Sequence, residues 1–212
     1  MDRIAEILLK KEAVTLNIKS PYTYSSGIRS PIYCDNRSLA GFVEERKEVV
    51  KAYAEKLENI EYDVIAGTST AGIQWAAWIA WEIDKPMAYV RGKAKKHGKG
   101  NQIEGAPVSG KNVVVIEDLI STGGSSIDAV DAVRENGGKV NFVVSIFTYE
   151  LEKASNLFKQ KDCNIVSLTS FSKLVDVAGQ LDYLAPEDIK IASEWNKDPV
   201  NWGPRNGFEN AK

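Results

Sequence analysis

The chain has 212 residues, enough for one domain with a sizeable core, and its apolar and charged fractions of 43% and 26% are those of an ordinary soluble domain. Its 27 basic and 29 acidic side chains leave a formal charge of −2, which gives no general reason to expect a nucleic-acid partner. No apolar run approaches the roughly 18 to 20 residues that span a bilayer, so the sequence predicts a cytoplasmic protein with no membrane partner.

The N-terminal region is expected to form a small accessory structure. Ile4, Ile7 and Leu8 recur at helical spacing and predict a short amphipathic helix over residues 2–12. In residues 13–40, Ser, Gly, Pro and Tyr separate short β-prone runs. We expect a small hood formed mainly by residues 1–40 together with C-terminal elements, within a single domain that spans residues 1–212.

From residue 42 onward, apolar periodicity predicts alternating helices and strands. Such alternation favours an α/β fold with a central, mostly parallel sheet flanked by helices. Segments 164–168, 173–179 and 189–195 continue less regularly, and a polar tail with Pro and Gly begins at Trp195. The expected helices are 42–57, 72–83 and 124–136, and the expected strands are 62–67, 87–90, 113–116 and 140–147.

The most informative stretch is VVVIEDLISTGGSS, in which an apolar strand meets two acids, a loop of small residues and a helix. Glycines let the backbone approach a ligand, hydroxyls donate hydrogen bonds, and the free N–H groups of a first helical turn favour an anion. Residues 121–125 therefore suggest a cradle for a phosphate group. Glu117 and Asp118 follow the apolar strand, where open α/β sheets bind ligands, and such a pair can accept hydrogen bonds from two sugar hydroxyls.

The acid pair and the phosphate loop together indicate a site for ribose 5-phosphate, and one simpler interpretation competes with it. In that interpretation the acids cap a helix and the glycines serve only to turn the chain, as a generic Gly/Ser loop does about as often as it binds a ligand. The apolar strand and the paired acids favour the ligand site. Neither a G-x-x-x-x-G-K-[ST] loop nor a G-x-G-x-x-G turn after a strand occurs, so kinase-like and dehydrogenase-like sites are not indicated.

The segment resembles the PRPP-binding motif of the type I phosphoribosyltransferases, where PRPP is phosphoribosyl pyrophosphate. Within that family, VRGKAKKHGKGNQIEG at 90–105, SGIRSPIYCDNR at 26–37 and GTSTAGI at 67–73 are similar to hallmarks of the orotate phosphoribosyltransferases. The resemblance extends over residues 13–200 and implies transfer of ribose 5-phosphate from PRPP to orotate, giving orotidine 5'-monophosphate and pyrophosphate in pyrimidine biosynthesis.

The resemblance also implies site residues. Arg91, Lys95 and His97 would bind the pyrophosphate end of PRPP as catalytic residues, together with Asp118. Ser121 would also contact orotate, alongside backbone groups of residues 30–33. The PRPP-binding set is Arg91, Lys95, His97, Glu117, Asp118, Leu119, Ile120, Ser121, Thr122, Gly123, Gly124 and Ser125.

The same resemblance implies an Mg²⁺ cofactor held mainly through PRPP, with no dedicated metal-ligand cluster, and a homodimer that shares the catalytic loop between subunits. Lysine in many family members is replaced here by Ser25, Ala71 and Gly92. Lys93 could supply the charge that is missing at Gly92, whereas Ser25 and Ala71 have no obvious substitute. The run of cations at 91–99 could alternatively be an ordinary solvated loop.

Two aromatic groups are expected to pack rather than bind ligands. Trp75, Trp78 and Trp81 recur every three residues, which predicts a buried helix face or a subunit interface. Tyrosines of the hood are typical of strand packing. Two other functions remain open: a phosphoribosyltransferase for a purine or uracil, and a PRPP-sensing regulatory protein of the same fold.

Overall fold

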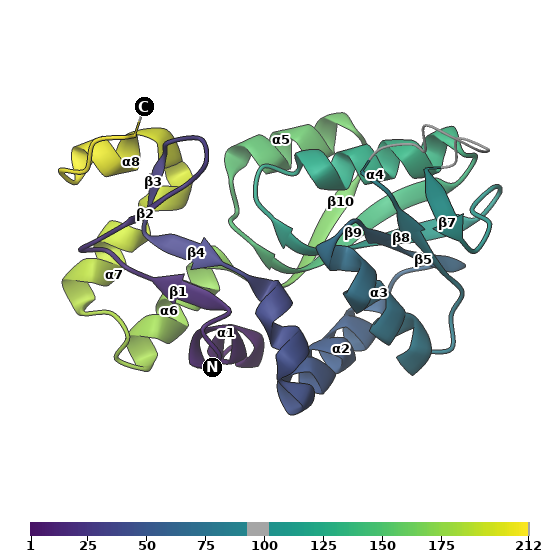
Figure 1. The fold of residues 1–212 in the computed structure, drawn as a ribbon, viewed down its shortest axis with the longest axis horizontal. Coiled ribbons are helices and arrows are strands. Elements are labelled where there is room, and N and C mark those ends of the chain that lie inside the picture. The colour runs from purple at the N-terminus through teal and green to yellow at the C-terminus, as the bar shows by residue number, and fades with distance from the viewer. Residues whose placement is uncertain (93–101, 212) are drawn as a thin grey trace.

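The computed structural model describes residues 1–92 and 102–211 (Figure 1). Short strands and a helix open the chain, and longer strands alternate with helices from residue 43 onward. The strands are β1 (Val14–Leu16), β2 (Tyr22–Thr23), β3 (Arg29–Ser30), β4 (Ile32–Cys34), β5 (Val64–Thr68), β6 (Met87–Val90), β7 (Ile103–Gly105), β8 (Asn112–Ile120), β9 (Lys139–Thr148) and β10 (Asn164–Ser170).

The helices cover the sheet and complete the hood. The α-helices are α1 (Arg3–Lys10), α2 (Val43–Leu57), α3 (Ala71–Glu82), α4 (Gly124–Glu135), α5 (Glu152–Gln160), α6 (Phe171–Gln180), α7 (Pro186–Ala192) and α8 (Pro199–Arg205). Two short 3₁₀ helices also occur, η1 (Asn36–Gly41) and η2 (Trp195–Lys197). In residues 1–92 and 102–211, every helix is too short or too polar to traverse a bilayer.

The centre is a six-stranded sheet with the order β10-β9-β8-β5-β6-β7. Five neighbouring strands are parallel, and only β7 runs antiparallel to its neighbour β6. In Figure 1, α4 and α5 lie on one face of the sheet, and α2 and α3 lie on the other. The predicted α/β fold with a mostly parallel sheet flanked by helices is confirmed.

The central strands are apolar on both faces because helices cover both. Successive side chains of a strand point to opposite faces, and β8 divides accordingly. Val114 and Ile116 join the core shared with α2, α3 and the hood, whereas Val113 and Val115 join the core under α4. An uninterrupted apolar run in the sequence therefore indicates a buried central strand.

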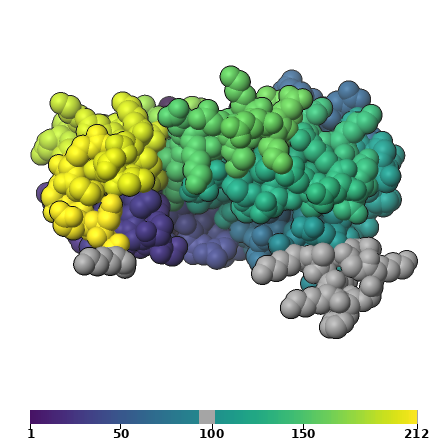
Figure 2. All heavy atoms as spheres, turned by 90° about the horizontal axis from the view of Figure 1, so that it is seen from above, coloured from purple at the N-terminus to yellow at the C-terminus, as the bar shows by residue number. Residues whose placement is uncertain are grey.

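The hood joins the two ends of the chain. Strands β1 and β4 pair antiparallel, as do β2 and β3. The helix α1 contacts α6, and α8 contacts β3. Figure 2 shows the C-terminal residues in yellow beside the purple N-terminal residues. These contacts agree with the expected hood of residues 1–40 and C-terminal elements, while the single-domain boundary stays a prediction.

The polar tail that begins at Trp195 packs against the rest of the hood. Trp195 and Trp202 are each 1% exposed, and the indole nitrogen of Trp202 donates to the carbonyl of Ile191 at 2.8 Å. The Arg29 side chain donates to the carbonyl of Glu209 at 2.8 Å. The tail has few apolar residues, yet both of its tryptophans belong to the hydrophobic core.

Two further elements differ from the predicted pattern. The strand expected at 113–116 continues as β8 to Ile120, because β9 pairs with it as far as Ile120 and Thr148. The acids are thus inside the strand. The helix α5 has no counterpart among the expected elements, although its apolar residues gather on one side of the helix and bury Ala154 and Phe158.

The tryptophan stripe of α3 is graded in burial. Trp75 is fully buried, Trp78 is half-buried beneath the Arg46 guanidinium at 4.7 Å from the ring centre, and Trp81 is 86% exposed. The expected packing is therefore confirmed for Trp75, and the subunit-interface alternative stays a prediction for Trp81.

Candidate active site

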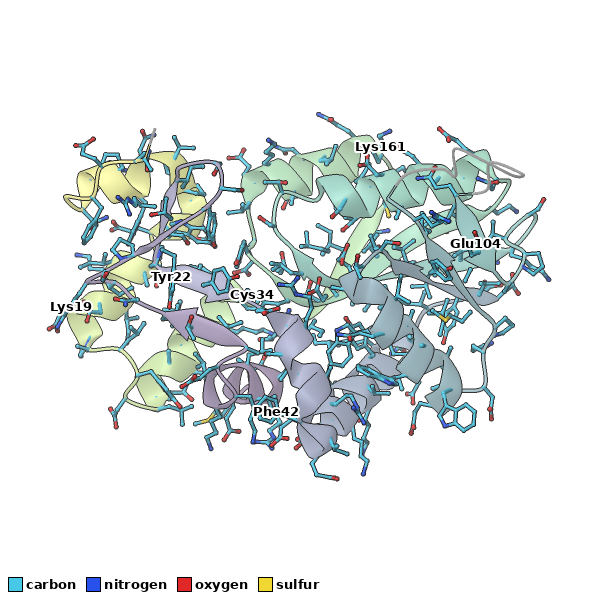
Figure 3. The ribbon with its side chains drawn as sticks, in the orientation of Figure 1. Lys19, Tyr22, Cys34, Phe42, Glu104 and Lys161 are labelled. Atoms are coloured by element: carbon cyan, nitrogen blue, oxygen red, sulfur yellow. The ribbon has the colours of Figure 1, made fainter. Side chains whose placement is uncertain are left out.

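An open pocket of about 520 Å³ lies where the hood meets the carboxyl ends of the central strands. Cys34, at the end of the hood strand β4, lies between the two parts of the molecule in Figure 3. The carboxyl edge of a parallel sheet is the place where ligands of α/β proteins bind. The pocket is lined by Cys34, Asp35, Arg37, Ser69, Thr70, Ala71, Glu117, Asp118, Leu119 and Ser125.

The acid pair lies where β8 keeps a strand partner on only one edge. Pairing with β5 ends at Ile116, whereas pairing with β9 continues to Ile120. Buried backbone groups need hydrogen-bond partners, and two side chains supply them here. The hydroxyl of Tyr53 donates to the Glu117 carbonyl at 2.6 Å, and the Asn36 amide donates to the Asp118 carbonyl at 2.8 Å.

The two acids have different surroundings. Glu117 is 5% exposed, and its carboxylate accepts hydrogen bonds from the Asp118 N–H at 3.1 Å and the Ser126 hydroxyl at 3.4 Å. Asp118 is half-buried. Burial, followed by the charge of Asp118, raises the pKa of Glu117 to about 8. Burial also raises the pKa of Asp118 above its usual value. Asp118 is therefore the acid better placed to meet a ligand.

The loop after β8 has the form expected of an anion cradle. Gly123 has a φ of 82°, and a Cβ there would lie 2.8 Å from the Phe158 ring, so the position requires glycine. The helix α4 begins at the next residue, and its first N–H groups lack intrahelical partners. Thr122 and Ser125 are exposed beside them. A phosphate group is the kind of ligand that such a turn favours.

The 67–73 loop forms the neighbouring wall of the pocket. A Cβ on Gly72 would lie 2.3 Å from the carbonyl oxygen of Ile116, so glycine lets α3 start directly against β8. The Ser69 N–H and hydroxyl both donate to the Val90 carbonyl, at 2.9 and 2.5 Å. Ser69 and Thr70 thereby stay at the pocket edge beside the end of β6.

Arg91 directly follows β6 and does not line the pocket itself. Its guanidinium lies 3.6 Å from the Glu104 carboxylate, and its N–H donates to the Gln102 carbonyl at 2.9 Å. Lys95 and His97 lie outside the described residues, as does Lys93. Ala71, which replaces a family lysine, lines the pocket.

The hood contributes residues that the sequence interpretation did not assign. Cys34, Asp35 and Arg37 line the pocket, and the Arg37 side chain donates to the Asp35 carboxylate at 2.7 Å. The carbonyls of Pro31 and Ile32 already accept hydrogen bonds within the hood, so the expected orotate contacts of residues 30–33 stay a prediction. The CDNR sequence was the available signal, because three polar residues follow a short strand there.

No group of three potential metal ligands among His, Cys, Asp and Glu occurs within the part of the chain that the structure describes. Both cysteines are free, with Cys163 buried and Cys34 half-buried. The carboxylates of Glu117, Asp118 and Asp35 line the pocket.

Comparison with known proteins decides the family. A model of the phosphoribosyl transferase domain matches residues 43–178. An orotate phosphoribosyltransferase of Listeria monocytogenes serotype 4b (strain F2365) is 50% identical over 203 residues, which are 95% of this chain and 97% of the relative. The chain belongs to the orotate phosphoribosyltransferases of this family. The resemblance inferred from the sequence is thereby confirmed.

Two further members of the family agree. The orotate phosphoribosyltransferase of Enterococcus faecalis (strain ATCC 47077 / OG1RF) is 49% identical over 95% of this chain and 97% of the relative. The crystal structure of orotate phosphoribosyltransferase from Aeropyrum pernix has a TM-score of 0.73 and 28% identity, and the match covers 86% of this chain and 99% of that one. The hood is thus part of what the family shares, although the domain model starts only at α2.

The buried Glu117 predicts an unusual dependence of stability on pH. Its folded-state pKa of about 8 exceeds the ordinary value of 4.5, so ionisation destabilises the folded state. This effect is absent below the unfolded pKa, grows as pH rises and is complete above the folded pKa. The free energy of unfolding should therefore fall between about pH 5 and pH 8, and Glu117→Gln should remove part of that fall.

Urea denaturation of both proteins across this range measures the effect. Glu58→Gln is the matched control, because Glu58 is exposed at the end of α2. It should follow the wild-type curve. A Glu117→Gln curve parallel to that of the wild type would contradict the prediction.

Proposed function

We propose that this chain is an Mg²⁺-dependent orotate phosphoribosyltransferase, which transfers ribose 5-phosphate from PRPP to orotate and releases pyrophosphate. The observation that carries the proposal is the joining of three features in one pocket. They are an acid in the wall (Asp118), Ser125 in the first turn of α4, and the hood residues Cys34, Asp35 and Arg37. Together they match a sugar phosphate flanked by a second substrate.

The proposed reaction is mainly electrostatic. Breaking the bond between the anomeric carbon and pyrophosphate develops positive charge on the ribose and negative charge on the leaving group, which oriented charges stabilise best. Asp118, supported by Glu117, would hold the ribose hydroxyls near the cationic ring. Arg91, Lys95 and His97 would neutralise the leaving pyrophosphate. Deprotonated orotate is itself a nucleophile, so the reaction needs no dedicated general base.

The remaining predicted contacts concern the phosphate and the base. The 5-phosphate would lie on the loop between β8 and α4, where exposed hydroxyls and free N–H groups converge. Ser121, half-buried at the start of that loop, would face orotate. Ile120 would contribute only backbone, since its side chain is fully buried, whereas Leu119 lines the pocket.

Mg²⁺, a homodimer and a cytoplasmic location belong to the same proposal. Mg²⁺ prefers oxygen ligands and keeps much of its water, so phosphate oxygens with the carboxylates of Asp118 and Asp35 suit it better than an all-protein cage. When bound, it would neutralise phosphate charge. A homodimer would let the loop around residues 91–99 serve the pocket of the other subunit.

The deciding experiment supplies purified protein with PRPP, Mg²⁺ and orotate, and follows the loss of orotate absorbance. Uracil, hypoxanthine and adenine are run in parallel. Turnover with orotate alone is the expected result. Consumption of another base would indicate a different phosphoribosyltransferase, and PRPP binding without turnover of any base would favour a regulatory protein.

Lys95→Ala tests the predicted role of the cationic loop. Removing one charge that stabilises the leaving pyrophosphate should lower kcat by roughly tenfold or more, or about 1.4 kcal/mol of barrier. Lys111→Ala is a matched control, because Lys111 precedes β8 at its amino end, away from the pocket. Unchanged kcat in Lys95→Ala would remove the loop lysine from the mechanism.

A further inference from the structure

The acid pair is held by hydrogen bonds from two side chains that lie far from it in the sequence. Tyr53, on α2, lies 64 residues before its acceptor Glu117. Asn36, the first residue of η1, lies 82 residues before its acceptor Asp118. Both side chains are fully buried. They bind consecutive carbonyls, those of Glu117 and Asp118, where β8 has lost its β5 partner.

Burial and packing hold the Tyr53 donor in place, and the Asn36 donor lies where the hood meets β8. Burial raises the pKa of Tyr53 well above its ordinary value, so the hydroxyl keeps its proton and donates. The Tyr53 ring packs against the Trp75 ring with their centres 6.3 Å apart. Asn36 directly follows the hood residue Asp35 and so links the hood to the end of β8. Fixed carbonyls fix the peptide planes on either side of the Asp118 α-carbon, because peptide units are planar.

We propose that Tyr53 and Asn36 are positioning residues, which aim the Asp118 carboxylate at the ribose hydroxyls by holding the backbone on both sides of it. The inference rests on the proposed function, because it takes ribose as the ligand of the acid pair. Neither side chain lines the pocket, so each acts only through the backbone.

The test compares two sugar phosphates that differ by one hydroxyl. Calorimetry gives the affinities of ribose 5-phosphate and 2-deoxyribose 5-phosphate, and their ratio reports the contact between the acids and the 2-hydroxyl. We expect Tyr53→Phe and Asn36→Leu each to lower the preference for ribose 5-phosphate over its 2-deoxy analogue by roughly fivefold. This is the effect of misaligning one hydrogen bond. Inorganic pyrophosphate should bind each variant as it binds the wild type.

Tyr24→Phe is the matched control. Its hydroxyl also donates to a main-chain carbonyl, that of Ile32 at 2.9 Å, but within the hood. It should leave the ratio unchanged whatever its effect on stability. Because Tyr53→Phe removes a single atom, it keeps the test valid even where Asn36→Leu fails to fold.

Two results would overturn the inference. Wild-type ratios in Tyr53→Phe, or equal losses for both sugars and pyrophosphate, would mean that the side chain is merely structural, with the proposed function intact. Equal affinity of the wild-type protein for the two sugar phosphates would contradict the inferred contact between the acid pair and the 2-hydroxyl. Orotate turnover by that wild-type protein would still support the proposed function, so the two failures are distinguishable.

Discussion

Asp118→Asn is expected to lower kcat/KM for PRPP by roughly 100- to 1000-fold, the range for losing one preorganised electrostatic group at a reacting centre. Asp118 is the half-buried acid of the pocket wall. The amide keeps the shape of the side chain but loses the charge that favours a cationic ribose. One of its two terminal atoms becomes a donor, which opposes a ribose hydroxyl less well than a carboxylate does.

Stability should not fall in this variant. Burial raises the folded-state pKa of Asp118, so at neutral pH its ionised form costs stability, and an uncharged amide removes that cost. Initial rates should therefore show a lower activity for Asp118→Asn than for the wild type. Thermal denaturation should show a melting temperature that is the same or higher.

Asp131→Asn is the control for this substitution. Asp131 lies on α4 and pairs with Lys161 at 2.6 Å, and neither residue lines the pocket. Its kcat/KM should equal that of the wild type. Wild-type activity in Asp118→Asn would exclude Asp118 from the reaction.

Trp195→Ala is expected to reduce the free energy of unfolding by about 3 to 5 kcal/mol, as is usual when a large aromatic side chain is removed from a core. Trp195 is 1% exposed. Its ring centre lies 5.1 Å from that of Tyr149 and 5.2 Å from that of Phe171. Tyr24 of the hood packs edge-on at 6.3 Å. The substitution would therefore open a cavity where the C-terminal segment joins the hood to the sheet.

Urea denaturation provides the measurement, and Trp81→Ala is the control. Trp81 has the same side chain but is 86% exposed, so its removal should change stability by no more than about 0.5 kcal/mol. Similar losses in both variants would contradict a core role for Trp195.

The sequence was sufficient where a signal is local. Apolar periodicity located β6 at its observed bounds and α2, α3 and α4 within one residue at each end, because amphipathic patterns are written in neighbouring residues. The order of residue types in 117–125 also predicted a site for a sugar phosphate. A strand, acids, small residues and a helix start are contiguous, and their order fixes their arrangement. Strand ends were less predictable, since β8 is extended by its pairing with β9.

Long-range partners could not be predicted in the same way. The CDNR and α2 sequences gave no indication that Asn36 and Tyr53 would meet the acid pair, because a hydrogen bond between distant residues leaves no periodic pattern. The inward position of Glu117 likewise depends on Ser126 and on the covering helices. Two adjacent acids of similar chemistry thus acquire different exposure, and pKa values raised by burial, only in the folded protein.

By itself, the sequence determined the fold class, because that depends on apolar patterns among nearby residues, and its motifs indicated the family. The position of the phosphate loop stays a prediction. Only the tertiary structure decided that the tail with Trp195 and Trp202 belongs to the core, and that the hood lines the pocket through Cys34, Asp35 and Arg37. The physical reason is that burial and hydrogen bonding depend on which distant surfaces meet, and a composition of mostly polar residues does not reveal where its few tryptophans will be buried.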